Sequence, residues 1–134
     1  MNEREERRLL ENLEKLIDML LIASESGAAI IVEGKRDSQA LRELGVKGSI
    51  IMAARRPALD LAESVAKDFD EIIILTDWDR EGDELALKIE GYLRYTKAHA
   101  DLEIRRMFKR YLRKEIKDVE SLSRYMEQIR DSKD

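Results

Sequence analysis

Residues 72 to 83 read IIILTDWDREGD, an apolar run followed at once by carboxylates and a glycine. The apolar run is rich in β-branched residues and too short for an ordinary helix, which indicates a buried strand. Asp77, Asp79 and Glu81 then place three carboxylates within one short turn. Hard divalent cations such as Mg²⁺ prefer oxygen ligands of this kind. The stretch therefore predicts a metal site at the carboxyl end of a strand.

A second apolar run, AAIIV at residues 28–32, also ends in charged residues, with EGKRD at 33–37. Glu33 adds a carboxylate at this strand end. Gly34 permits a close backbone approach or an unusual turn, and Lys35 brings a positive charge suited to a phosphate. The two strand ends therefore predict related chemistry.

Apolar spacing and turn residues predict the remaining elements. From Glu3 to about Ser24, apolar residues recur at three- and four-residue steps, which indicates an amphipathic helix. The other expected elements are a helix from Asp37 or Ser38 to about Leu44, a strand over 49–53, a helix over 58–68, a helix over 82–98 with His99 near its end, a strand over 102–108, and a last helix capped by Asp118. This alternation predicts an α/β fold with a four-stranded, mostly parallel sheet and helices on both faces.

The length of 134 residues predicts a single globular unit. Within it we expect an N-terminal helical extension at 1–26, a core at 27–108, and a basic segment with a C-terminal helix at 109–134. In open parallel sheets the functional crevice lies beyond the carboxyl ends of the strands, where the strand order reverses. If the strands before Glu33 and Asp77 are neighbours at that point, their loops form one crevice.

Composition narrows the possible chemistry. The chain has no cysteine and a single histidine, which excludes disulfides and thiolate metal sites and argues against histidine-based catalysis. No stretch reads as a membrane span or a secretory signal, so we expect a cytoplasmic protein. The net charge is −4, so any contact with nucleic acid must come from local basic clusters.

The two acidic motifs together resemble the signature motifs of the Toprim domain family. The first is VEGKRD at 32–37 and the second is TDWDREGD at 76–83. A lone D-x-D pattern is weak, but E-G-K after one strand and D-x-D-x-x-G after a later strand, in this order, form a specific signal. The resemblance covers roughly 28–108, and small stand-alone Toprim proteins look most similar. The family also includes small ribosomal RNA maturation nucleases, bacterial-type primases and type IA topoisomerases.

The resemblance implies roles for the motif residues. Glu33 is similar to the family's general acid/base, and Asp77 and Asp79 are similar to its metal ligands. Glu81 is similar to a third ligand, often bound through water. The implied cofactor is Mg²⁺, with Mn²⁺ as an alternative. Lys35 is expected to act in catalysis beside Glu33. Gly34 and Gly82 are expected to be structural residues of the two motifs.

Basic residues supply candidate contacts to a nucleic-acid backbone, because phosphates are the groups that arginine and lysine bind there. A basic run that begins at Arg105 fits such contacts and fits a solvated helix face equally well. Trp78 likewise fits base stacking or packing against a neighbouring helix. The candidate nucleic-acid contacts are Arg55, Arg56, Arg80, Arg105, Arg106, Lys109 and Arg110.

Two functions are compatible with these features. The first is Mg²⁺-dependent phosphodiester chemistry on RNA or DNA, by a nuclease or related phosphotransferase. The second is a non-catalytic nucleic-acid-binding or scaffold module in an RNA-processing, replication or repair complex. We expect neither a complete topoisomerase nor a self-sufficient primase, because both need further domains. A homodimer or a partner protein is the expected source of substrate recognition.

Overall fold

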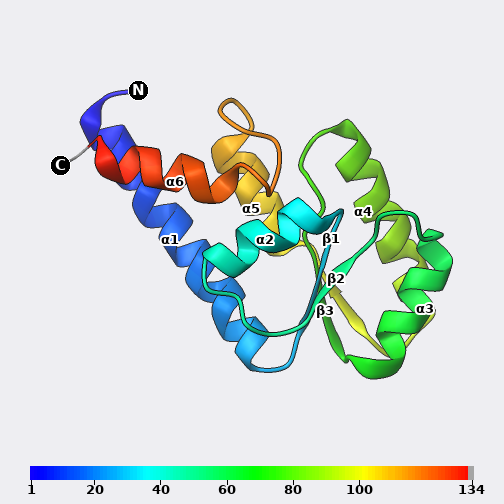
Figure 1. Ribbon diagram of the computed structural model, residues 1–134. Coiled ribbons are helices and arrows are strands. Elements are labelled where there is room, and N and C mark those ends of the chain that lie inside the picture. The colour runs from blue at the N-terminus through cyan, green and yellow to red at the C-terminus, as the bar shows by residue number, and fades with distance from the viewer. Residues whose placement is uncertain (133–134) are drawn as a thin grey trace.

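The computed structural model describes residues 1–132, which contain four strands and six helices (Figure 1). The strands are β1 (Ala29–Val32), β2 (Ile50–Met52), β3 (Glu71–Ile74) and β4 (His99–Asp101). The helices are α1 (Glu3–Glu25), α2 (Lys35–Glu43), α3 (Ala58–Asp68), α4 (Arg80–Leu93), α5 (Glu103–Leu112) and α6 (Leu122–Asp131). Strands and helices alternate from β1 to α5, which confirms the α/β fold class.

The four strands form one sheet in the order β2-β1-β3-β4. Every neighbouring pair is parallel, so the predicted sheet is confirmed and is parallel throughout. From β1 the chain moves outward to β2, and β3 then pairs with the other side of β1. The strand order therefore reverses between β1 and β3. This reversal creates the crevice in which such sheets bind ligands.

Helices cover both faces of the sheet (Figure 1). Successive strand residues point to opposite faces. Ile30 and Ile73 belong to a core shared with α1, α2, α5 and α6, whereas Ile31 and Ile72 belong to a core shared with α3 and α4. Because both faces of the central strands are buried, β1 and β3 read as continuous apolar runs in the sequence.

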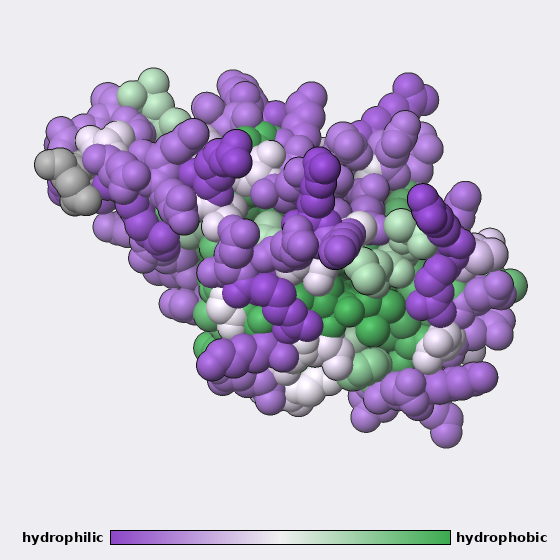
Figure 2. Space-filling model, viewed as in Figure 1, coloured by the Kyte–Doolittle hydropathy of each residue, from purple (hydrophilic) through white to green (hydrophobic). Residues whose placement is uncertain are grey.

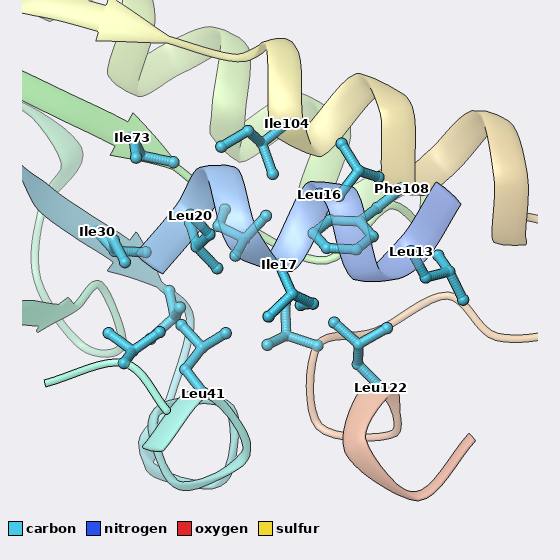
Figure 3. Packing of buried hydrophobic residues seen from close by; sticks show 14 of the residues in the cluster. Leu13, Leu16, Ile17, Leu20, Ile30, Leu41, Ile73, Ile104, Phe108 and Leu122 are labelled. Atoms are coloured by element: carbon cyan, nitrogen blue, oxygen red, sulfur yellow. The ribbon is translucent and has the colours of Figure 1, made fainter. Parts of the chain in front are cut away.

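Helix α1 packs along the larger of the two cores. Its Leu13 and Leu20 are fully buried, and Leu16 and Ile17 beside them are nearly so. Figure 3 shows this face of α1 directed toward the sheet and three other helices. The labelled partners are Ile30 and Ile73 of the sheet, Leu41 of α2, Ile104 and Phe108 of α5, and Leu122 of α6. The amphipathic face of α1 is thus buried within this chain.

The surface is mostly hydrophilic, with a hydrophobic area over the sheet between α2 and α3 (Figure 2). Edge strand β2 lies there, and its Met52 is 45% exposed. Leu59 of α3 is 44% exposed. Among residues 1–132, no helix combines the length and the apolar character needed to cross a membrane.

The strand expected over 102–108 is wrong. These residues enter helix α5, and the fourth strand, β4, lies just before it. Ile104, Phe108 and Leu112 are buried at four-residue spacing, which is the helical period. Strand β4 pairs only with β3 and has no apolar run, so its sequence carries little strand signal.

Several element boundaries also differ from those expected. Helices α2 and α4 begin earlier than predicted because Gly34 and Asp79 occupy their N-cap positions. Helix α4 ends at Leu93, so His99 lies in β4 rather than near the end of a helix. Asp118 does not cap α6 directly. Its Oδ1 accepts a hydrogen bond from the backbone of Ser121, the N-cap residue, at 2.7 Å.

Candidate functional site

The loops that follow β1 and β3 meet at the carboxyl edge of the sheet. The backbone N–H of Asp77 donates a hydrogen bond to Oε2 of Glu33 at 2.8 Å. The structure therefore brings together two motif residues that are 44 positions apart in the chain.

Negative charge is concentrated in this crevice. Burial, together with the charges of Asp37, Glu33 and Asp118, raises the pKa of Asp77 to about 7. Burial also raises the pKa of Glu33, and the nearby charges of Asp79 and Asp37 act in the same direction. Both groups therefore resist losing their protons when the protein holds no cation.

Asp79 and Glu81 lie at the start of α4, at the outer side of the crevice. Oδ1 of Asp79 accepts a hydrogen bond from the backbone of Gly82 at 2.7 Å, which caps the helix. Glu81 is in the first helical turn, where a negative charge interacts favourably with the helix dipole. Both side chains are exposed. Asp79 therefore has a structural role in addition to its predicted role as a ligand.

The two motif glycines differ in what requires them. A Cβ at Gly82 would lie 1.7 Å from the carbonyl oxygen of Asp77, so no other residue fits there without moving the loop. At Gly34 the backbone is extended, with φ −149°, and a Cβ would be 4.0 Å from its nearest neighbour, Oδ2 of Asp37. Within residues 1–132, neither the φ of Gly34 nor its surroundings requires the unusual turn or close approach that a glycine permits.

Arg105 of α5 lies inside the molecule beneath the acidic loop. Its side chain is 7% exposed. Nε donates to the carbonyl and hydroxyl oxygens of Thr76, and Nη2 donates to the carbonyl oxygen of Asp77 and to Oδ1 of Asp83, both at 2.6 Å. Lys109 also bonds to Asp83, and these two cations lower the pKa of Asp83 although burial raises it. The hydrogen bonds of Arg105 and Lys109 thus stabilise the acidic loop from the side of α5.

The other candidate basic residues are exposed. Lys35 begins α2 beside Glu33, and Arg55 and Arg56 follow β2 at the same edge of the sheet. Arg80 pairs with Glu84 at 3.5 Å, and Arg106 pairs with Glu103 at 3.7 Å. Arg110 lies at a separate hollow between α5 and the start of α1.

Trp78 packs against a neighbouring helix, which is one of the two roles expected for it, whereas the segment between α5 and α6 makes a contact that the sequence does not predict. The indole ring is 2% exposed and stacks on Phe108, with ring centroids 5.6 Å apart. Packing, rather than base stacking, is therefore the role of this ring. The backbone of Val119 donates to Oδ1 of Asp77 at 3.0 Å. A backbone donor leaves no signal in residue type, so the sequence could not reveal it.

The carboxylate oxygens in this crevice are of the kind that a hard divalent cation prefers. Glu33, Asp77 and Asp79 each commit one carboxylate oxygen to a backbone N–H, and no N–H or hydroxyl within residues 1–132 bonds to the other. No three side chains in the described chain form a ready-made metal cage. Mg²⁺ commonly binds through one or two carboxylates, with water and phosphate oxygens completing its shell, so such a cage is not required.

Comparisons with known proteins agree with this geometry. UPF0292 proteins of Methanosarcina barkeri and Thermococcus onnurineus are 44% and 45% identical to the chain over 124 and 112 residues. These matches cover 92% and 84% of this chain, and 87% and 81% of the relatives. A solved structure of a protein from Aquifex aeolicus is similar with a TM-score of 0.71 and 26% identity, covering 81% of this chain and 96% of that one.

The family model of the Toprim domain matches residues 28–122, which include both acidic motifs and the segment that reaches Asp77 from the other side. The match extends beyond the residues expected from the motifs alone and takes in α5 and the connection to α6. The chain therefore belongs to the Toprim domain family and, by its sequence identity to the archaeal relatives, to the UPF0292 proteins.

Proposed function

We propose that this protein carries out divalent-cation-dependent phosphodiester chemistry on nucleic acid, as a nuclease or related phosphotransferase. Membership of the Toprim family indicates a nucleic-acid-related function with metal binding. The observation that supports catalysis is the contact of Glu33 with Asp77 across the crevice at the reversal of strand order. It combines a group able to move a proton with a group able to bind a cation.

Asp77 and Asp79 would hold Mg²⁺ or Mn²⁺ through the carboxylate oxygens that have no partner within residues 1–132. A bound divalent cation stabilises the negative charge that develops on phosphate oxygens and orients the phosphate. The backbone contacts of both aspartates fix their orientation before any ligand arrives. Little ordering of these side chains is then needed when the site is used.

Glu33 is suited to act as the general acid/base. Its Oε2 is held by the backbone of Asp77, which leaves Oε1 for the reacting hydroxyl. Burial and nearby carboxylates raise its pKa, which brings proton exchange nearer to neutral pH. A catalytic group works best when its pKa lies close to the operating pH.

Exposed cations at the same sheet edge would bind the nucleic-acid backbone. Lys35 follows Glu33 directly, and Arg55 and Arg56 lie beyond the end of the neighbouring strand β2. Contacts of this kind position a phosphate chain without reading its sequence. Arg105 is assigned instead to support of the acidic loop, because its guanidinium is already bonded within the protein.

A cleavage screen tests this function. Wild-type protein with Mg²⁺ or Mn²⁺ is expected to cut at least one substrate among structured RNAs and single- and double-stranded DNA. Glu33→Gln and Asp77→Asn should each reduce the rate about 100-fold or more, because each removes a reacting or ligating carboxylate. Glu71→Gln is the matched control, since Glu71 is an exposed carboxylate at the other end of β3. Cleavage that survives both site substitutions would contradict the proposal.

A non-catalytic binding module is the second candidate. The observation that favours it is the use of Asp79 to cap α4, which draws one of its oxygens away from the crevice. This function predicts nucleic-acid binding that weakens steeply as salt increases, with no product under any cation. A reproducible product band that disappears in Asp77→Asn would exclude it.

A further inference from the structure

The connection between α5 and α6 contacts the acidic loop at Asp77 and Trp78. We call residues 116–119 of this connection the strap. The indole Nε1 of Trp78 donates to the carbonyl oxygen of Ile116 at 2.7 Å, and the backbone N–H of Trp78 donates to that of Lys117 at 2.9 Å. In return, the backbone N–H of Val119 donates to Oδ1 of Asp77 at 3.0 Å.

The strap is anchored at both ends by buried groups. The side chain of Val119 is fully buried in the larger core, and the ring of Trp78 is stacked on Phe108 of α5. The backbone N–H of Ile116 continues the hydrogen bonding of α5 by donating to Leu112 at 2.9 Å. The strap therefore has a defined position relative to both the acidic loop and the core.

We infer that the strap is a working part of the site, and that Trp78 is a positioning residue that holds it against the cation-binding carboxylate of Asp77. This inference rests on the proposed function of the crevice. The hydrogen bond from Val119 occupies Oδ1 of Asp77 and so fixes the direction in which Oδ2 points. Hydrogen bonds that orient a ligand typically change metal affinity by about 10- to 100-fold.

The choice of tryptophan follows from the same contacts. A buried indole N–H needs an acceptor, and here the acceptor is a strap carbonyl. Phenylalanine would keep an aromatic ring against Phe108 but would leave the carbonyl oxygen of Ile116 without this donor. Trp78→Phe therefore separates the positioning role from the packing role.

The test compares wild type, Trp78→Phe and Leu61→Ala. Leu61 is fully buried in the core on the opposite face of the sheet, so its truncation weakens packing without touching the strap. Titration calorimetry with Mn²⁺ measures cation affinity, and amide hydrogen exchange by NMR measures protection of the Val119 N–H. Trp78→Phe should raise the dissociation constant for Mn²⁺ about tenfold and speed hydrogen exchange at the Val119 N–H. In Leu61→Ala, the Mn²⁺ affinity and the protection of the Val119 N–H should both stay close to their wild-type values, once the protection is corrected for the lower global stability of this variant.

The outcomes separate the inference from the function on which it rests. Equal Mn²⁺ affinity and equal Val119 protection in wild type and Trp78→Phe, with cleavage by wild type intact, would overturn the inference alone. A wild-type protein that binds no Mn²⁺ would overturn the proposed function and the inference together. If Leu61→Ala loses as much Mn²⁺ affinity as Trp78→Phe, the loss in Trp78→Phe comes from lower global stability and not from the strap. This result too would overturn the inference.

Discussion

Two glycines in α4 show how single residues shape the site. A Cβ at Gly82 would overlap the carbonyl oxygen of Asp77, whereas a Cβ at Gly91 meets nothing within 4 Å. Gly82→Ala should destabilise the protein by about 2 kcal/mol or more, because the acidic loop must move. Gly91→Ala should stabilise it by about 0.5–1 kcal/mol through helix propensity. Urea denaturation of both variants measures their free energies of unfolding. Equal changes in the two variants would contradict the close contact between residue 82 and the carbonyl oxygen of Asp77.

Arg105 is a buried residue whose side chain donates hydrogen bonds to Thr76, Asp77 and Asp83. Arg105→Gln would leave backbone carbonyls of Thr76 and Asp77 and the carboxylate of Asp83 short of donors. We expect a loss of about 2–4 kcal/mol in the free energy of unfolding. Arg106→Gln, on the exposed face of the same helix, should change stability by less than about 0.5 kcal/mol. Chemical denaturation of the pair tests this, and a loss in Arg106→Gln that matches Arg105→Gln would refute it.

At this scale the sequence revealed the acidic groups but not their supports. Glu33, Asp77 and Asp79 were recognisable because charged residues directly after apolar strands have no role in a core. Arg105 looked like one member of a basic surface run, because its neighbours Arg106 and Arg110 are also basic. Only the tertiary packing of α5 distinguishes the buried cation from the exposed ones.

Among the elements, β4 and α5 show where periodicity misleads. Leu102, Ile104 and Phe108 fit both an alternating strand and one face of a helix, and both patterns predict burial. The burial of Leu112 and the half-buried Met107 agree with the helix. Strand β4 is short and its sequence is HAD, so no local signal marks it. Strands β1 and β3 were predictable because both of their faces are buried, so each reads as a continuous apolar run.

Helix α1 lies before the Toprim match but is buried in the same core as the sheet. Leu20→Ala should cost about 2–5 kcal/mol because it opens a cavity among residues from several elements. Met19 is 50% exposed, so Met19→Ala should be nearly neutral and serves as the control. Thermal unfolding of both variants measures the contrast. A neutral Leu20→Ala would mean that α1 contributes little to the stability of the core.

For the whole molecule, the sheet topology decides the position of the site. The order β2-β1-β3-β4 places the ends of β1 and β3 side by side. The sequence predicts a parallel sheet and an acidic motif after each of the two strands, but their adjacency enters there only as a condition for a shared crevice. The path of the strap was not predictable, because segment 113–121 has no regular element and acts through its backbone. Long-range placement of such a connection depends on packing of α5 and α6 rather than on local sequence.

The charge of the crevice couples stability to pH. The pKa of Asp77 rises from 3.8 to about 7 on folding, so the folded protein holds this proton more tightly than the unfolded chain. Without a cation, stability is therefore highest below the unfolded value and falls as the pH rises toward 7. Burial raises the pKa of Glu33 and of Asp37, and both act in the same direction. A bound divalent cation replaces these protons and should restore the lost stability.

Titration calorimetry of Mg²⁺ into the protein tests the central claim that Asp77 is a cation ligand in this crevice. Because a cation must displace the proton of Asp77, affinity should rise about thirtyfold from about pH 5.5 to about pH 8 and level off above a pKa of about 7. Asp77→Asn should bind weakly at both values. Affinity in wild type that ignores pH, or binding by Asp77→Asn as tight as in wild type, would contradict the account.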